Sequence, residues 1–133
     1  MNQDPSSKNL VVVVKGQISE QHLRDYLEVA SQTMQALKAH NKDIILSKFS
    51  TNLQDKTNFR WVLLLQSYSS LLKYFSSPII ALYMANHNQL GRSYEIEIYG
   101  SLAEDEIDEL NEMGLTFELF SCQAGYDNLE VLH

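Results

Sequence analysis

The sequence is poor in cysteine, and this shortage narrows the class of protein. Cys122 is the single cysteine in 133 residues. One thiol excludes a disulfide within the chain and is typical of proteins of the reducing cytoplasm. We therefore expect a cytoplasmic domain that is held together by a packed core, which a chain of this length can build.

Basic residues and long apolar runs are also scarce. Ten Lys and Arg face 17 Asp and Glu, for a net charge of −7, and the cations are scattered along the chain. A nucleic-acid surface needs a basic stripe that displaces counterions from phosphates. The longest apolar runs, such as residues 62–65 and 78–85, are too short to span a bilayer. We expect neither a nucleic acid nor a membrane as a partner.

Metal and cofactor motifs are missing from the sequence as well. The four histidines, His22, His40, His87 and His133, do not have the spacing of metal ligands on a helix or strand. The sequence has no glycine-rich phosphate loop and no G-x-S-x-G motif. We predict no metal site and no cofactor.

The patterns that are present alternate between strand and helix. The pattern predicts a disordered leader (1–9), one domain (10–122, with a core at 10–100 and an addition at 101–122) and a tail (123–133). Within the core it predicts a strand at 10–15 ended by Gly16, a helix capped by Ser19 and ending near residue 40, strands at 43–50 and 59–68, a helical region at 69–89 and a strand at 93–100.

Pro78 interrupts the second helical region. Inside a helix a proline costs about 3 kcal/mol, whereas in the first turn it costs little, because its missing N–H would have no partner there. Ser76 or Ser77 can cap a helix that begins at this proline. The sequence therefore predicts two helices, at 69–76 and 78–89.

The order β-α-β-β-α-β predicts a ferredoxin-like α+β fold with an antiparallel sheet of order 4-1-3-2. The fourth strand alternates, so Ile96 and Ile98 should be buried while Glu95 and Glu97 are exposed at an edge. After Gly100 we expect a helix at 103–113 capped by Ser101 and followed by Gly114, and then a fifth strand at 115–122.

The two core helices can cover only one face of such a sheet. The third strand nevertheless carries large apolar residues on both faces, Trp61, Leu63 and Leu65 on one and Val62 and Leu64 on the other. An uncovered apolar face is rarely tolerated, so either residues 101–122 or a second subunit must cover it. The added helix has a narrow apolar stripe, which favours a homodimer through the open sheet face, extended or braced by the fifth strand.

The stretch WVLLLQSYSSLLKYFSSPIIALY (61–83) resembles the strand, broken helix and Ser-Pro corner of the dimeric α+β barrel superfamily, and in particular the antibiotic-biosynthesis monooxygenase-like proteins. The resemblance covers about residues 10–100. It implies subunits that pair sheet to sheet, a pocket between sheet and helices for a small aromatic or apolar ligand, and activity as a cofactor-independent oxygenase.

The haem-degrading members of that superfamily differ from this chain. They carry an Asn on the first strand, a Trp at the end of the third and a His on the broken helix. This chain has VVVVK on the first strand, Trp61 at the opposite end of the third, and His87 about three residues too late. Haem degradation is therefore not expected.

Six polar residues on the second half of the core are candidates for the site. We predict His87 and Tyr68 as catalytic residues and Tyr83, Asn86, Arg92 and Tyr94 as ligand-binding residues. His87 could be a general base, or a histidine at a helix C-terminus that faces water. The tyrosines could line a pocket or pack in the core, and Arg92 could bind a carboxylate or remain a solvated charge.

Two other classes of function remain open. One is a non-catalytic regulatory module of the ACT kind, for which Gly16 after the first strand would suit a ligand loop. The other is an interaction module whose open sheet binds another protein. A ligand that stabilises the protein without being altered would identify the first of these.

Overall fold

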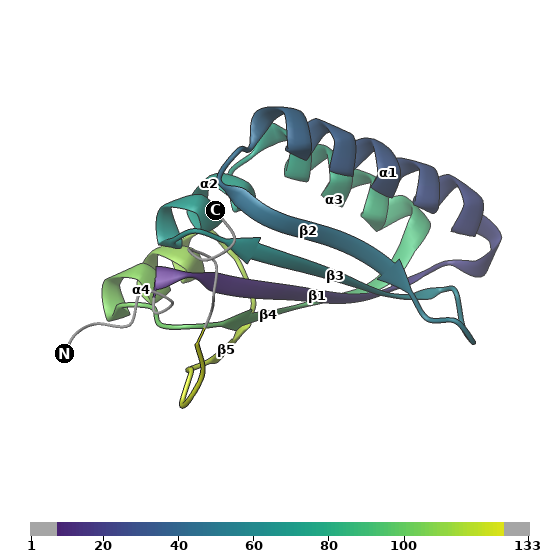
Figure 1. Ribbon diagram of the computed structural model, residues 1–133. Coiled ribbons are helices and arrows are strands. Elements are labelled where there is room, and N and C mark those ends of the chain that lie inside the picture. The colour runs from purple at the N-terminus through teal and green to yellow at the C-terminus, as the bar shows by residue number, and fades with distance from the viewer. Residues whose placement is uncertain (1–7, 127–133) are drawn as a thin grey trace.

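One five-stranded sheet carries its long helices on a single face in the computed structural model, which describes residues 8–126 (Figure 1). In chain order the elements are β1 (Leu10–Ile18), η2 (Glu20–His22), α1 (Leu23–His40), β2 (Ile44–Thr51), β3 (Asn58–Leu65), α2 (Tyr68–Phe75), α3 (Pro78–Leu90), β4 (Gly91–Tyr99), α4 (Glu104–Glu112) and β5 (Glu118–Phe120). The predicted leader and tail lie largely outside the described residues.

The strand order is β2-β3-β1-β4-β5. Neighbours among the first four strands are antiparallel, whereas β5 runs parallel to β4. The predicted ferredoxin-like order of the first four strands is confirmed. The two most apolar strands, β1 and β3, lie in the middle of the sheet, where they are flanked on both sides.

The helical region is broken at Pro78 as predicted. α2 ends at Phe75 and α3 begins at Pro78, with Ser77 at the N-cap position. The Ser77 hydroxyl accepts a hydrogen bond from the Ile79 N–H at 3.1 Å. The proline therefore occupies the first turn of a new helix, where its missing N–H costs little.

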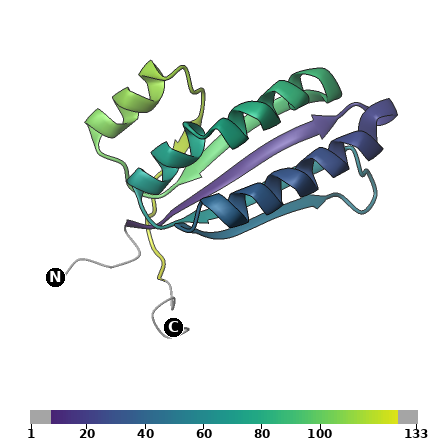
Figure 2. The ribbon, with the colours of Figure 1, turned by 90° about the horizontal axis from the view of Figure 1, so that it is seen from above.

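The two faces of the sheet differ in cover. α1 and α3 lie side by side over one face (Figure 2). Under them Trp61, Leu63 and Leu65 are fully buried, whereas Val62 and Leu64 on the opposite face are only half-buried. We call the first side the helix face and the second the open face.

The register predicted for β4 is confirmed. Ile96 and Ile98 are buried on the helix face, and Glu95 on the open face is exposed. Glu97 is less exposed than predicted, because its carboxylate pairs with the Lys15 ammonium at 3.0 Å.

The prediction for Gly16 is wrong, because the strand continues through it to Ile18 with an irregular register between the two. A Cβ on Gly16 would collide with the Phe59 ring and lie 2.8 Å from the Ser93 carbonyl oxygen. Glycine is needed here for the close approach of neighbouring strands, a use that the sequence pattern does not distinguish from a turn.

Two predicted helix caps are also wrong. Ser19 precedes η2 without a side-chain cap, and His22 occupies the N-cap position of α1. α4 begins after Ala103 rather than after Ser101, because the Glu106 carboxylate accepts a hydrogen bond from the Ala103 N–H at 2.8 Å. The Glu106 side chain, inside the first turn of α4, therefore caps the helix, a role that the sequence predicts for Ser101 in front of the helix.

The C-terminal addition does not spread across the open face. α4 lies at the end of α2, where the Tyr68 hydroxyl donates to the Glu109 carboxylate at 2.6 Å. β5 is shorter than predicted and extends the sheet beside β4. Among the described residues, no helix is both long enough and apolar enough to cross a membrane.

Candidate functional site

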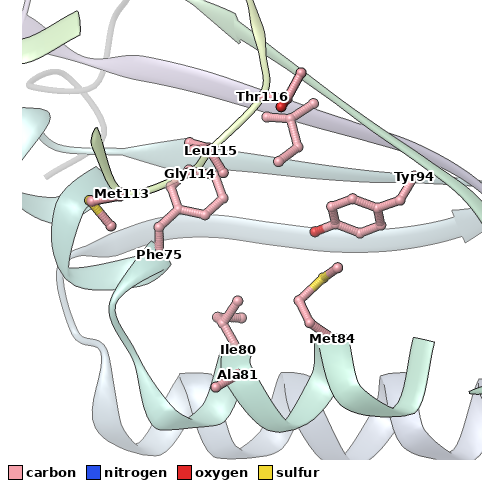
Figure 3. Close-up of a pocket in the computed structure, with 10 residues that line it drawn as sticks. Phe75, Ile80, Ala81, Met84, Tyr94, Met113, Gly114, Leu115 and Thr116 are labelled. Atoms are coloured by element: carbon pink, nitrogen blue, oxygen red, sulfur yellow. The ribbon is translucent and has the colours of Figure 1, made fainter. Parts of the chain in front are cut away.

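A cavity of about 310 Å³ lies between α3, β4 and the α4–β5 connection (Figure 3). Its size is at the lower end of the range of small-molecule pockets. Most of its wall is apolar, and Tyr94 and Thr116 bring hydroxyl groups to it. The lining residues are Phe75, Ile80, Ala81, Met84, Tyr94, Ile96, Met113, Gly114, Leu115 and Thr116.

The local sequence explains this wall. Ile80 and Met84 are one turn apart on α3 and therefore share a face of that helix. Tyr94 and Ile96 alternate along β4 on the helix face. Gly114 has a φ of 84°, a left-handed conformation that ends α4 and turns the chain over the cavity.

A buried chain of hydrogen bonds connects α1 with α3 next to this cavity. The Tyr26 hydroxyl lies 2.5 Å from the Tyr83 hydroxyl and 2.6 Å from His87 Nδ1. All three side chains are at most 3% exposed. His87 also forms a hydrogen bond to the backbone of Ser93.

The Ser93 contact indicates the direction of the chain. Because it raises the pKa of His87, we assign the ring N–H to the Ser93 carbonyl, and Nδ1 is then the acceptor. Tyr26 therefore donates to His87 Nδ1, and Tyr83 donates to the Tyr26 oxygen. The result is an ordered path of protons from one phenol through a second to an imidazole.

Burial keeps these groups neutral. Burial lowers the pKa of His87, although the hydrogen bond to Ser93 acts in the opposite direction. Burial raises the pKa of Tyr26 and of Tyr83 well above the usual range. Near pH 7 the imidazole is therefore a neutral proton acceptor and the phenols are donors.

Tyr94 connects the hydrogen-bonded chain with the cavity. Its ring centroid lies 5.0 Å from that of His87 and 6.4 Å from that of Tyr83. In Figure 3 the hydroxyl of Tyr94 points into the space that Met84 and Ile80 border from α3. Burial raises the pKa of Tyr94 too, so its hydroxyl is a neutral hydrogen-bond donor.

Glycine makes room for the imidazole. A Cβ on Gly91 would collide with the His87 ring. The ring packs edge-on against Tyr26 at 5.6 Å and against Phe59 at 6.2 Å. His87 is therefore held in one orientation by its neighbours.

The structure brings three of the six predicted site residues together, namely His87, Tyr83 and Tyr94. For His87 the alternative of a histidine facing water is wrong, because it is 3% exposed. Tyr26 on α1 completes the hydrogen-bonded chain and is not among the residues that the sequence predicts for the site. A signal existed, since a tyrosine at a core position needs a partner for its hydroxyl.

The other three predicted residues lie elsewhere. Tyr68 connects α2 to α4 through Glu109. The Asn86 amide donates to the Leu82 carbonyl of its own helix at 3.1 Å, and Arg92 is exposed on β4. In the described part of the chain, no group of three or more His, Cys, Asp or Glu side chains could hold a metal ion.

No family model and no curated protein matches the chain. Solved structures do match its fold. MupZ from Pseudomonas fluorescens is 16% identical, with a TM-score of 0.73 over 92% of this chain and 97% of MupZ. A candidate antibiotic biosynthesis monooxygenase from Deinococcus radiodurans is 13% identical, with a TM-score of 0.64 over 71% of this chain and 93% of that one.

A third similar structure is that of a mutant of SnoaB, a cofactor-independent oxygenase from Streptomyces nogalater. It is 8% identical, with a TM-score of 0.62 over 72% of this chain and 95% of SnoaB. At such identities the likeness establishes the fold. The resemblance predicted from residues 61–83 is confirmed at that level: the chain has the ferredoxin-like α+β fold of the antibiotic biosynthesis monooxygenase-like proteins.

Proposed function

We propose that the protein is an enzyme of the cofactor-independent oxygenase kind, acting on a small aromatic or apolar compound in the cavity between α3 and β4. One observation carries the proposal: a neutral imidazole with two phenols in line packs against Tyr94, which is part of the wall of an apolar cavity. The oxygenase fold of SnoaB is consistent with it.

In this proposal Tyr83, Tyr26 and His87 transfer protons. An aromatic compound gives up electrons to O2 far more readily after it has lost a proton. Tyr83 adjoins Tyr94 and is not itself part of the cavity wall, so the transfer requires the Tyr94 side chain to move aside. A substrate CH2 group next to a ring carbonyl would then pass its proton to the Tyr83 oxygen while Tyr83 gives its own to Tyr26 and Tyr26 gives its own to His87 Nδ1. The carbanion then reacts with O2, and CH2 plus O2 become C=O plus H2O. The substrate supplies all four electrons, and O2 accepts them.

The apolar wall has a second role in this account. It binds the ring system and excludes water, which strengthens the hydrogen bonds around the developing charge. Phe75 contributes a flat aromatic surface to that wall, and Met84 contributes a flexible side chain that can adjust to the shape of a ligand.

The alternative is a protein that binds the same kind of compound without changing it. The deep burial of His87 favours this alternative, since the imidazole has no direct contact with solvent. Its ACT-like version loses one support, because Gly16 lies within β1 and not in a ligand loop.

Oxygen uptake distinguishes the two functions. Purified protein is mixed with a panel of anthrones and quinols, and O2 consumption is followed alongside thermal stabilisation. We expect one O2 consumed per substrate, and a loss of about 100-fold in rate in His87→Asn, the usual contribution of a general base. His40→Asn is the matched control, because His40 is exposed at the end of α1. Stabilisation without O2 uptake would assign the cavity to binding alone.

We also propose that two copies pair through their open faces in the cytoplasm. Half-buried and exposed apolar side chains form one row across all five strands of that face. The row contains Leu46, Leu64, Val11, Tyr99 and Phe120, which are cross-strand neighbours. Residues 121–126 border this row at its end, where a cavity of about 420 Å³ remains. Cys122 is an exposed free thiol, which supports a reducing compartment.

A further inference from the structure

A groove at the edge of the sheet is separate from the cavity under α3. One cavity of about 450 Å³ lies between α1 and β2, and a second of about 480 Å³ lies between the end of α1 and the α2–α3 junction. Asn41 lines both, so the two cavities adjoin there. We call them together the edge groove, because β2 is the outermost strand on that side of the sheet (Figure 2). Its walls come from within residues 34–47 and 73–79.

The edge groove exposes apolar surface on its β2 side. Ile44 pairs with Leu65 of β3 and Leu46 pairs with Leu64, so Ile45 between them is the extra residue of a bulge. Ile45 is 39% exposed. An exposed isoleucine on an edge strand is a point at which another chain can attach, and edge strands without such a role usually carry charges there.

The rim of the edge groove is basic. Lys38, Lys42 and Lys73 border it together with His40, and no described aspartate or glutamate belongs to its walls. The Lys73 ammonium lies 4.0 Å from the Asp43 carboxylate, whereas Lys38 and Lys42 have no carboxylate partner among residues 8–126. The chain as a whole carries a net charge of −7, so this concentration of cations is a local feature.

Asn41 offers a buried amide where the two cavities adjoin. The residue is 5% exposed, and its backbone N–H and carbonyl bond to Leu37 and Ile44. Its side-chain amide forms no hydrogen bond within the described part of the chain. Buried polar groups are nearly always paired, so this amide suits a partner that the chain itself does not supply. A side-chain amide has both a C=O and an NH2 group, and it can therefore bond to the N–H and the C=O of a peptide backbone.

We propose that the edge groove binds an extended acidic segment of a partner protein. The backbone of that segment bonds to the Asn41 amide, its apolar side chains pack against Ile45, and its carboxylates pair with Lys38 and Lys42. In the described sheet no strand lies on the outer side of β2, so an extended segment can also add to this edge. Charge complementarity selects the occupant, because a rim of cations without carboxylates favours an acidic chain.

This site is independent of the proposed oxygenase reaction. The edge groove shares no wall residue with the cavity between α3 and β4. Leu46 belongs both to its wall and to the apolar row of the open face, so the variants that test the groove leave Leu46 unchanged.

Two matched peptides test the site. The acidic probe is Glu-Val-Glu-Ile-Glu-Val-Glu, and the control probe carries glutamine in place of each glutamate, with the same length and shape. Both carry a fluorescent label, and their binding to the full chain is followed by fluorescence anisotropy. We expect the acidic peptide to bind about tenfold more tightly at low salt, and the difference to shrink at high salt, because salt screens surface charges.

Three variants locate the binding. Lys38→Glu reverses a charge at the rim, and Asn41→Leu removes the amide at similar volume. Lys56→Glu is the matched control, because it makes the same charge change in the exposed β2–β3 loop. We expect the first two to bind the acidic peptide about tenfold more weakly and the control to match the wild type. Free Asn41→Leu should melt no lower than the wild type, because an amide without a partner is removed.

Four outcomes would overturn the inference. Two concern the peptides: equal binding of both probes to the wild type, or an affinity for the acidic peptide that is unchanged in both Lys38→Glu and Asn41→Leu. If one of these variants fails to fold, the other still decides. Binding of decanoate in the groove without binding of the acidic peptide would make it a lipid site. Self-association that is lost in Lys38→Glu, without peptide binding, would assign the groove to a second copy. Oxygen uptake tests the proposed function separately, and none of these outcomes changes it.

Discussion

The two faces of the sheet differ in how deeply their side chains are buried and in their charge. On the helix face, side chains such as Trp61 and Leu63 are fully buried under α1 and α3. On the open face, one apolar row is followed toward the other end of the strands by charges, among them Lys15, Arg60 and Glu95. Lys15 pairs with Glu97 at 3.0 Å and with Glu95 at 3.6 Å.

The two faces therefore suit different kinds of partner. The chain itself covers the helix face, and a cavity of about 310 Å³ with a few polar groups lies under α3. The open face has no deep core, but its apolar row is continuous across the sheet. A small molecule suits the first face, and a flat surface such as a second copy suits the other.

The largest expected effect is a difference in the free energy of unfolding between substitutions on the two faces. Leu63→Ala removes a fully buried side chain and should lower the free energy of unfolding by about 2–5 kcal/mol. Leu64→Ala changes the next residue of the same strand, which is half-buried on the open face, and should cost clearly less. Urea unfolding of the two variants makes the comparison. Equal losses would mean that the open face is as closely packed as the helix face.

The proposed pairing is broken by a charge in the apolar row. Leu64→Lys should convert a dimer of about twice 15.3 kDa into a monomer in light scattering at micromolar concentration. Leu53→Lys is the control, because Leu53 is 95% exposed in the β2–β3 loop and should leave the mass unchanged. A wild-type protein that is already monomeric at these concentrations would end the dimer proposal.

The helix face should also respond to pH through His87. Burial lowers the pKa of His87 in the folded state, so the unfolded chain binds a proton more readily. Stability should therefore be constant above about pH 6.5, the ordinary value, and fall as the pH drops from there toward the folded pKa. The slope reaches at most about 1.4 kcal/mol per pH unit. Denaturant midpoints of the wild type and His87→Asn across this range measure it, and a slope that persists in the variant would assign the effect to other groups.

The smallest effect is expected at the break between α2 and α3. Pro78→Ala should change the free energy of unfolding by less than about 1 kcal/mol, because Pro78 is exposed in the first turn of α3. Thermal or urea unfolding suffices to check it. A loss of several kcal/mol would show that the proline ring is part of the packed core.

The fold could be predicted further than the site. Strand order, the break at Pro78 and the alternation of β4 follow from local patterns, since burial on both faces and helix-start chemistry are visible in the sequence. The predictions for Gly16 and Ser101 are wrong because each depends on a residue elsewhere. Gly16 is required by the Phe59 ring on the neighbouring strand. The cap expected of Ser101 is supplied by the Glu106 carboxylate, one turn further along. Neither neighbour can be read from the local pattern.

The candidate site depends on contacts between distant residues. Tyr26 and His87 are 61 positions apart, and only the packing of α1 against α3 places their polar atoms 2.6 Å apart. Tyr68 was a reasonable candidate by position, yet its hydroxyl binds Glu109 instead. Tyr68 and Tyr83 both occupy helical positions next to apolar residues, so the sequence does not distinguish them. They differ in the hydrogen-bond partner of the hydroxyl, which is Glu109 for Tyr68 and Tyr26 for Tyr83.

A crystal structure grown with the aromatic compound that stabilises the protein most would test the division between the two faces most directly. We expect this compound in the cavity between α3 and β4, in contact with Tyr94 and Met84. We also expect a second copy against the row of Val11, Leu64 and Tyr99. A compound bound on the open face, with the α3–β4 cavity closed by its own side chains, would contradict this division.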